Sequence, residues 1–288
     1  MEREDLIRRV PLFVNRVAVL ATMHRKEEAI APILEPLGLK VIVPPNFDTD
    51  RFGTFSRDVK RFGTQLEAAK AKAERALQIT GETIAIASEG SFVPHPAFPS
   101  IPCNRELVLL LDKEQDLEII GEAISMETNY RQQKIHTVQE AIEFAEAIGF
   151  PAHGLIAFIN SPGDTQIIKG INTQDELLNA VALGLQSAKE LIIETDMRAL
   201  YNPTRMKNIA KATHDLIRKI QQVCPNCDCP GFAEAERRKG LPCMLCHFPT
   251  ELTLTTIYQC KKCGSRQEKL FPDGQEKADP GQCAFCNP

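Results

Sequence analysis

Apolar residues alternate between short continuous runs and helical stripes along the first 222 residues. Short apolar or β-branched runs predict buried strands, and apolar residues spaced three and four apart predict helices. Strands are expected at 17–22, 39–43, 83–88, 106–111, 154–159 and 191–194. Helices are expected over 29–38, 64–81, 137–148, 173–189 and 203–222. Segment 117–125 fits a strand or a helix, and its periodicity does not decide between them.

A turn signal breaks this simple alternation. Ser161-Pro162-Gly163-Asp164 has the composition of a tight turn, so residues 165–171 are expected to pair back on the preceding strand as a hairpin. Alternating strands and helices indicate an α/β fold, and a hairpin makes the sheet mixed rather than parallel. We therefore predict an α/β domain over residues 1–222, with a mixed sheet and flanking helices.

The stretch 64–92 contains the clearest helix–strand unit. Thr64 followed by Glu67 forms a capping-box pattern at the start of the helix, and Gly81 is a natural stop. The strand that follows ends in Ser88-Glu89-Gly90-Ser91, which we expect to be a polar turn. Ligands gather at the carboxyl ends of strands in such folds. Glu89 is therefore the first candidate functional residue.

Composition and charge exclude several classes of protein. Hydrophobic residues make up 43% of the chain, yet none of its apolar runs reaches the ~20 residues of a membrane span. The N-terminus lacks the apolar core of a secretory signal, so a cytoplasmic location is expected. A net charge of −4 argues against a protein that coats nucleic acid or an anionic membrane.

The cysteines form a separate unit at the end of the chain, and they predict a module over residues 223–288. Four Cys-x-x-Cys pairs match two structural zinc sites with four cysteines each and no open coordination position. The eight ligands are Cys224, Cys227, Cys243, Cys246, Cys260, Cys263, Cys283 and Cys286. Cys229 and His247 are competing ligands.

One of the three ways to distribute the four cysteine pairs over two zinc ions can be excluded. Residues 251–259 contain no turn residue and predict a continuous strand, which places the second and third pairs at opposite ends. Sequential and interleaved pairing both remain, and we favour the sequential one, with the first two pairs on one zinc. The module carries eight basic and eight acidic side chains. This balance favours protein contact, self-association or bracing of the core over nucleic-acid binding.

Other candidate residues lie at strand ends and in loops. Thr22, His24 and Lys26 follow the first strand and precede a helix, an arrangement that often presents anion-binding groups. The polar loop 46–61 contains Asp48 and Asp50, which are candidate carboxylates beside Glu89. His95, between two prolines, is expected in a rigid loop.

Two family resemblances follow from these motifs. The whole chain resembles an uncharacterised bacterial family, common in cyanobacteria, that joins the same N-terminal domain to a paired-cysteine tail ending in Cys-Asn-Pro. This resemblance implies no known activity. Residues 17–112 more distantly resemble the inosine-triphosphate pyrophosphatase and Maf superfamily of nucleotide hydrolases. Three motifs carry that resemblance: the 22–26 segment after the first strand, the helix start at 64–73 and the segment 88–92.

The superfamily resemblance implies roles for particular residues. Thr22, His24 and Lys26 would hold phosphate oxygens, and Arg198 and Arg205 would close the site from the C-terminal side. The catalytic carboxylates would be Glu89 and Glu67, with Glu89 binding Mg²⁺ or Mn²⁺.

The sequence thus predicts a metal-dependent hydrolase or binder of nucleotides or related phosphorylated small molecules, carrying a structural zinc module. The alternative is a non-enzymatic adaptor whose zinc module recruits a protein or RNA partner. Protein contact or self-association through the module is the expected macromolecular interaction.

Overall fold

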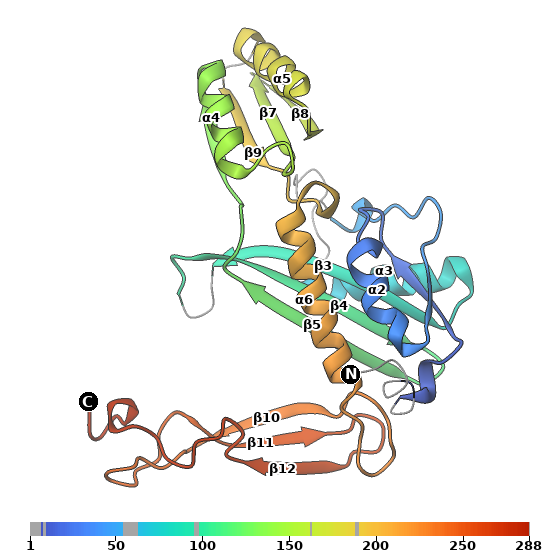
Figure 1. Ribbon diagram of the computed structural model, residues 1–288, viewed down its shortest axis with the longest axis vertical. Helices are drawn as coiled ribbons and strands as arrows, with labels where there is room; N and C mark the ends of the chain where they lie inside the picture. The colour runs from blue at the N-terminus through green and yellow to red at the C-terminus, as the bar shows by residue number, and fades with distance from the viewer. Residues whose placement is uncertain are drawn as a thin grey trace.

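The computed structural model describes residues 7, 10–53, 63–94, 98–161, 163–187 and 190–287. Residues 54–61 of the predicted polar loop and His95 lie outside the described residues. The described chain forms three β-sheets with five α-helices packed around two of them (Figure 1). The predicted α/β class with a mixed sheet is confirmed. None of the described helices combines the length and apolarity needed to cross a bilayer.

The central sheet has five strands in the order β2-β1-β3-β4-β5. Its strands are β1 (Val17–Ala21), β2 (Lys40–Ile42), β3 (Ile84–Pro94), β4 (Pro102–Asp112) and β5 (Leu117–Ser125). β1 is parallel to both β2 and β3, and β3, β4 and β5 form an antiparallel meander. Segment 117–125, whose periodicity was ambiguous, is therefore a strand.

Helices cover both faces of the central sheet. α2 (Glu27–Leu34) and α6 (Pro203–Ile220) share one apolar cluster with one face, and α3 (Gln65–Thr80) packs its alanine stripe on the other. α6 crosses β5 at Gly121, where an added Cβ would meet the carbonyl oxygen of Ala212 at 2.2 Å. Gly121 therefore permits the close approach of this helix to the sheet.

The predicted polar turn after residue 88 is wrong. β3 continues through Ser88-Glu89-Gly90-Ser91 to Pro94 because β4 pairs with it along this whole length. β1, on the other side of β3, ends at Ala21 opposite Ala87. The polar residues of β3 therefore lie beyond the carboxyl end of β1, beside the segment that leads into α2.

A second sheet lies between β5 and α6 in sequence. Its order is β6-β9-β7-β8, formed by β6 (Gln132–Ile135), β7 (Leu155–Ser161), β8 (Asp164–Ile171) and β9 (Glu190–Thr195). α4 (Val138–Ile148) and α5 (Gln174–Ser187) share its apolar core. β7 and β8 form the hairpin that the turn signal predicted. The apolar pattern of the sequence does not separate these strands from the central sheet, and β6 has no apolar run that would predict it.

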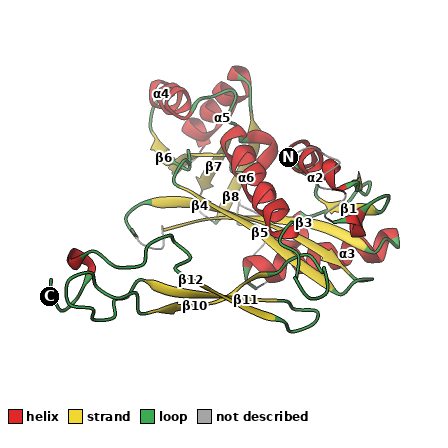
Figure 2. Ribbon diagram, turned by 60° about the horizontal axis from the view of Figure 1, so that its bottom comes forward, coloured by secondary structure: helices red, strands yellow, loops and turns green. Residues whose placement is uncertain are grey.

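The cysteine-rich region forms a third, antiparallel sheet after α6 (Figures 1 and 2). Its strands are β10 (Ala233–Lys239), β11 (Thr253–Gln259) and β12 (Arg266–Leu270). β11 corresponds to the strand predicted at 251–259. β10 and β12 are exposed along most of their length and carry too few apolar residues to be recognised as strands.

Candidate functional site

Five charged side chains are buried together beyond the carboxyl end of β1, and we call them the buried charge cluster. Its members are Lys26, Lys72, Glu89, Glu106 and Arg205, and each is at most 6% exposed. Lys72 on α3 forms an ion pair with Glu89 on β3. Arg205 on α6 donates to the Glu106 carboxylate on β4, with Nε 2.8 Å from Oε1. Elements from both faces of the sheet thus contribute to the cluster.

Lys26 is the unusual member of this cluster. Its ammonium donates to the side-chain and main-chain oxygens of Ser88, at 3.0 and 3.3 Å. Among the described residues, no carboxylate lies within ion-pairing distance of its Nζ. Burial and, to a smaller extent, the nearby charges of Arg205 and Lys72 lower the pKa of Lys26 to about 7, against the opposing effect of the two glutamates.

A network of buried side chains fixes the ion pair between Glu106 and Arg205. Asn104 donates to Glu106 at 2.9 Å, and Asn208 on α6 donates to Asn104 at 2.9 Å. Arg205 also donates through Nη1 to the carbonyl oxygen of Met197 at 2.7 Å. The pair is accommodated because Gly90 has no side chain: an added Cβ would lie 2.4 Å from Glu106 Oε1 and 2.5 Å from Arg205 Nη2.

The Gly90→Ala substitution should therefore destabilise the protein by about 1–3 kcal/mol, because the new methyl group overpacks a buried ion pair. Urea denaturation followed by circular dichroism would measure the change in the free energy of unfolding. Ser91→Ala, one residue along the same strand, provides the comparison and should cost less. An unchanged stability for Gly90→Ala would show that the pair moves aside freely.

A second group of polar residues borders the cluster. The His24 Nε2 atom lies 3.0 Å from Asp50 Oδ1, and the charge of Asp50 also acts on Arg198. Burial and the charge of Lys26 lower the pKa of His24 to about 4, despite the opposing effect of Asp50. His24 is therefore neutral near pH 7, and it donates its Nε2 proton to the aspartate. Arg198 itself forms an ion pair with Asp196 at 2.6 Å.

A cavity of about 350 Å³ opens at the end of β1 and includes Thr22 in its lining. The segment Val43–Asp48 forms its other side. α2 starts here, but Glu27 and Glu28 occupy its first turn. Their carboxylates already neutralise the positive end of the helix dipole. An anion at this site would therefore depend on cationic side chains rather than on the helix N-terminus.

The structure brings most of the predicted site residues together. Three of them, Lys26, Glu89 and Arg205, are members of the buried charge cluster, and His24 lies directly beside it. Arg198 is close enough to Asp50, the partner of His24, for the charge of Asp50 to act on it. Glu67 has a different position: it is exposed, and its carboxylate accepts a hydrogen bond from the backbone amide of Thr64 in the predicted capping box. Glu67 is therefore a helix-capping residue in this structure.

The predicted Mg²⁺ or Mn²⁺ ligand Glu89 is paired with a lysine. Within the described parts of the chain, only the two cysteine groups bring three or more potential ligands close enough to share a metal ion, and Glu89 is not part of either. A divalent ion at Glu89 would have to displace Lys72 first.

Two members of the buried charge cluster were missed from the sequence. Lys72 lies on the buried stripe of α3 between Ala69 and Ala76. A lysine on an apolar stripe is the signal that could have identified it. Glu106 is the first residue of the apolar run predicted as a strand, and its position at the strand end was not interpreted.

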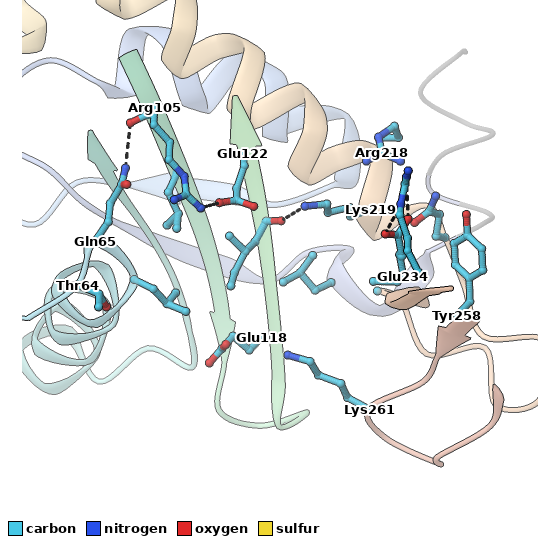
Figure 3. A pocket seen from close by; sticks show the side chains of 18 residues that line it. Thr64, Gln65, Arg105, Glu118, Glu122, Arg218, Lys219, Glu234, Tyr258 and Lys261 are labelled. Atoms are coloured by element: carbon cyan, nitrogen blue, oxygen red, sulfur yellow. Dashed lines mark hydrogen bonds and ion pairs between the residues drawn. The ribbon is translucent and has the colours of Figure 1, made fainter. Parts of the chain in front are cut away.

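A larger cavity, of about 800 Å³, separates the central sheet from the cysteine-rich sheet (Figure 3). Most of its charged side chains are already paired. Arg105 contacts Glu122 at 2.6 Å, and Lys219 donates to the carbonyl oxygen of Ile120 at 2.7 Å. On the side of the cysteine-rich sheet, Arg237 pairs with Glu234 at 2.7 Å. This cavity offers less uncompensated positive charge than the buried charge cluster.

The eight paired cysteines form two groups, each of which could hold a metal ion, and we call them the proximal and distal centres. The proximal centre consists of Cys224, Cys227, Cys260 and Cys263, and the distal centre consists of Cys243, Cys246, Cys283 and Cys286. Four sulfur–sulfur contacts within these centres measure 3.6, 3.7, 3.9 and 3.6 Å, too long for disulfides. Four sulfurs at about 2.3 Å from a tetrahedral Zn²⁺ lie about 3.8 Å apart. The donor atoms and their spacing therefore fit zinc.

The favoured sequential pairing is wrong, because each centre combines one pair before β11 with one pair after it. β10 is antiparallel to β11 and starts with Ala233 opposite Gln259. The pair that precedes β10 is thereby brought beside the pair that follows β11. The prediction that β11 separates the second and third pairs is confirmed. Cys229 and His247 belong to neither centre.

Comparisons with known proteins identify a family but no activity. No curated protein and no solved structure matches the chain. Residues 72–288 match a family described as a domain of unknown function, DUF6671. The matched region starts at Lys72 and includes Glu89, Glu106, Arg205 and both cysteine centres, whereas Lys26 precedes it. Because the match covers well over half of the chain, the protein belongs to the DUF6671 family.

Proposed function

We propose that this protein binds a phosphorylated small molecule, with nucleotides as the leading class, at the buried charge cluster. The phosphate would contact Lys26 and draw on the positive charges of Lys72 and Arg205. Thr22 lines the 350 Å³ cavity from which the ligand would approach, and His24 would lie beside the phosphate through its proximity to Lys26. Arg198 would lie at the outer side of the site, where the charge of Asp50 already acts on it.

The observation that carries this proposal is the excess of positive charge in a buried place. Among the residues that the structure describes, two cations and two carboxylates act on Lys26, so the five members of the cluster are three cations and two anions. A buried ammonium without a paired carboxylate is energetically costly. A bound phosphate would supply the missing negative charge and convert this cost into binding free energy.

Both cysteine centres are proposed to hold structural Zn²⁺. Four thiolates complete the coordination of each ion, so neither zinc would have an open position for a substrate. The proximal centre adjoins the end of α6, because Cys224 follows this helix by only a few residues. Zinc at this centre would brace the cysteine-rich sheet against the helix that carries Arg205.

Hydrolysis of the bound phosphate is the finer form of the proposal. It requires Lys72 to exchange its partner from Glu89 to the phosphate. The Glu89 carboxylate would then bind Mg²⁺ or Mn²⁺ and orient a water molecule for attack on phosphorus. Glu89→Gln should in that case abolish turnover while leaving binding of the phosphate largely intact.

Binding can be tested by isothermal titration calorimetry with phosphate, pyrophosphate and nucleoside mono-, di- and triphosphates. Lys26→Met should weaken the best ligand by about 10–100-fold, the equivalent of one hydrogen bond to a charged group. Wild-type affinity should also fall as the pH rises through about 7, because Lys26 loses its proton there. Lys113→Met, which removes an exposed lysine paired with Glu74, is the matched control and should bind normally.

Two results would contradict the proposal. One is the absence of binding by every phosphate compound at pH 6, where Lys26 is protonated. The other is equal affinity of the wild type and Lys26→Met for a ligand that does bind. If binding occurs but Mg²⁺ or Mn²⁺ elicits no product, the protein is a binder and the hydrolase form is wrong.

A further inference from the structure

The distal metal centre is surrounded by exposed apolar side chains. Met244 and Phe248 are each 55% exposed, and Leu245 and Phe285 are each 70% exposed. Isolated apolar residues on a protein surface are common, whereas contiguous apolar patches mark interaction sites. These four residues would mark an interaction site only if they form one continuous surface.

Local geometry shows that they do. Met244 and Leu245 lie between the ligands Cys243 and Cys246, and Phe285 lies between Cys283 and Cys286. The ligand sulfurs of this centre all lie within 4.8 Å of one another, so the two loops are adjacent. The rings of Phe248 and Phe285 are stacked with centroids 5.8 Å apart. We call Met244, Leu245, Phe248 and Phe285 the distal tip.

The proximal centre shows that metal binding does not require such a surface. Its loops contain Pro225 and Asn226 in one pair and Lys261 and Lys262 in the other. It lies close to the central sheet, where a Cβ on Gly231 would meet Ile119 at 3.1 Å. The distal centre has an apolar surface instead, and the C-terminus beside it projects away from the rest of the molecule in both views (Figures 1 and 2). The four side chains of the tip are exposed in the described structure, as a contact surface requires.

The area of the distal tip suits a modest symmetric contact. With about 150–250 Å² of surface for each aromatic side chain, the two rings expose on the order of 200–300 Å². Met244 and Leu245 have matching exposed fractions and add a comparable area. Two copies meeting at this patch would bury roughly 800–1,200 Å² in total, less than a standard stable interface and in the range of weak, transient contacts.

The charges of the module argue against a nucleic acid at the distal tip. Residues 224–288 carry eight basic and eight acidic side chains, and two zinc ions on eight thiolates would leave four negative charges in excess. Such a surface offers little to a phosphate backbone. Two modules of this charge would also repel one another weakly, so the attraction between copies has to come from the apolar tip.

We infer that the distal tip is a self-association surface, through which two copies of this chain form a two-fold symmetric dimer. Met244, Leu245, Phe248 and Phe285 of one copy pack against the same four residues of the other. A single patch serves both copies because a two-fold interface is self-complementary. The limited area predicts a reversible dimer with a dissociation constant on the order of micromolar.

Sedimentation velocity over a concentration series of the full-length, zinc-loaded protein tests this inference. We expect the wild type to shift from monomer to dimer as its concentration rises. Leu245→Ser and Phe285→Ser, made separately, should each raise the dissociation constant at least about tenfold. Ile79→Ser, at a residue of α3 that is 51% exposed, is the matched control and should dimerise like the wild type.

Zinc content separates loss of the interface from loss of the fold. Each serine variant should retain two zinc ions per chain, as measured by inductively coupled plasma mass spectrometry. A wild type that stays monomeric at every concentration would overturn the inference. So would a dimer that both tip variants preserve, since a different surface would then hold it together.

Discussion

Replacing Cys224 and Cys260 together with serine should remove one metal ion from the protein and leave the other in place. The two residues belong to the proximal centre, so the distal centre keeps all four of its thiolates. Replacing Cys224 and Cys243 together should remove both ions, because each substitution damages a different centre. Native mass spectrometry, which counts the metal ions on each chain, would measure the difference.

The same two variants discriminate between the possible pairings. Under sequential pairing, Cys224 and Cys243 would share an ion, so the results would be reversed: one ion retained in Cys224→Ser/Cys243→Ser and none in Cys224→Ser/Cys260→Ser. Structural zinc contributes about 10–16 kcal/mol of apparent binding free energy in small zinc modules. We therefore expect the variant that loses both ions to lose the ordered cysteine-rich sheet, with a corresponding loss of strand signal in circular dichroism.

The cysteine pairing depends on more than the local sequence pattern. The sequence correctly predicts the cysteine ligands and the strand β11, because both have strong local signals. Choosing between the two arrangements required β10, which has the sequence Ala-Glu-Ala-Glu-Arg-Arg-Lys and little apolar content. β10 is a strand because β11 pairs with it, so only the tertiary structure reveals that the first and third cysteine pairs are neighbours.

The central sheet shows a similar division. Apolar runs located β1, β3 and β4, and the capping box located the start of α3, because hydrophobic burial and helix capping act locally. The end of β3 could not be located in this way. Glycine and serine at residues 90 and 91 indicate a turn by composition, but pairing with β4 keeps the chain extended to Pro94. Glycine is used there for close packing around Glu106 and Arg205 rather than for a turn.

The candidate site was predictable in part for the same reason. Thr22, His24 and Lys26 follow a recognisable strand, and the carboxyl end of such a strand is a usual place for a ligand. The apolar stripe of α3 could have identified Lys72 as a buried lysine, but only the tertiary structure shows that Lys72 and Glu106 lie near Lys26. Glu67 was predicted both as part of the capping box of α3 and as a catalytic carboxylate. Its side chain lies at the capping position, away from the buried charge cluster.

Replacing Lys26 with methionine should stabilise the protein by about 2–4 kcal/mol at pH 6. Methionine has a similar length and carries no charge, so the cost of burying an ammonium without a paired carboxylate disappears. Burial and neighbouring cations lower the pKa of Lys26 from 10.5 to about 7. This change corresponds to an upper bound of about 5 kcal/mol. The lost hydrogen bonds to Ser88 reduce the expected gain by about 1 kcal/mol.

The pH dependence of this gain has a definite sign. Below pH 7, Lys26 is protonated in both the folded and the unfolded wild type, and the full cost of burial is present. Between pH 7 and 10.5 the unfolded chain binds a proton that the folded chain has released, so the wild type gains stability as the pH rises. The advantage of Lys26→Met should therefore shrink across this range and be nearly absent above pH 10.5.

Urea denaturation of the wild type, Lys26→Met and the control Lys113→Met at pH 6 and pH 9 would measure this trend. A destabilised Lys26→Met at pH 6, or a gain that does not shrink at pH 9, would show that the ammonium is satisfied in the folded protein. If the variant is more stable and has also lost phosphate binding, Lys26 lowers the stability of the free protein and is required for binding. A residue that lowers stability is expected at a binding site rather than in a structural core.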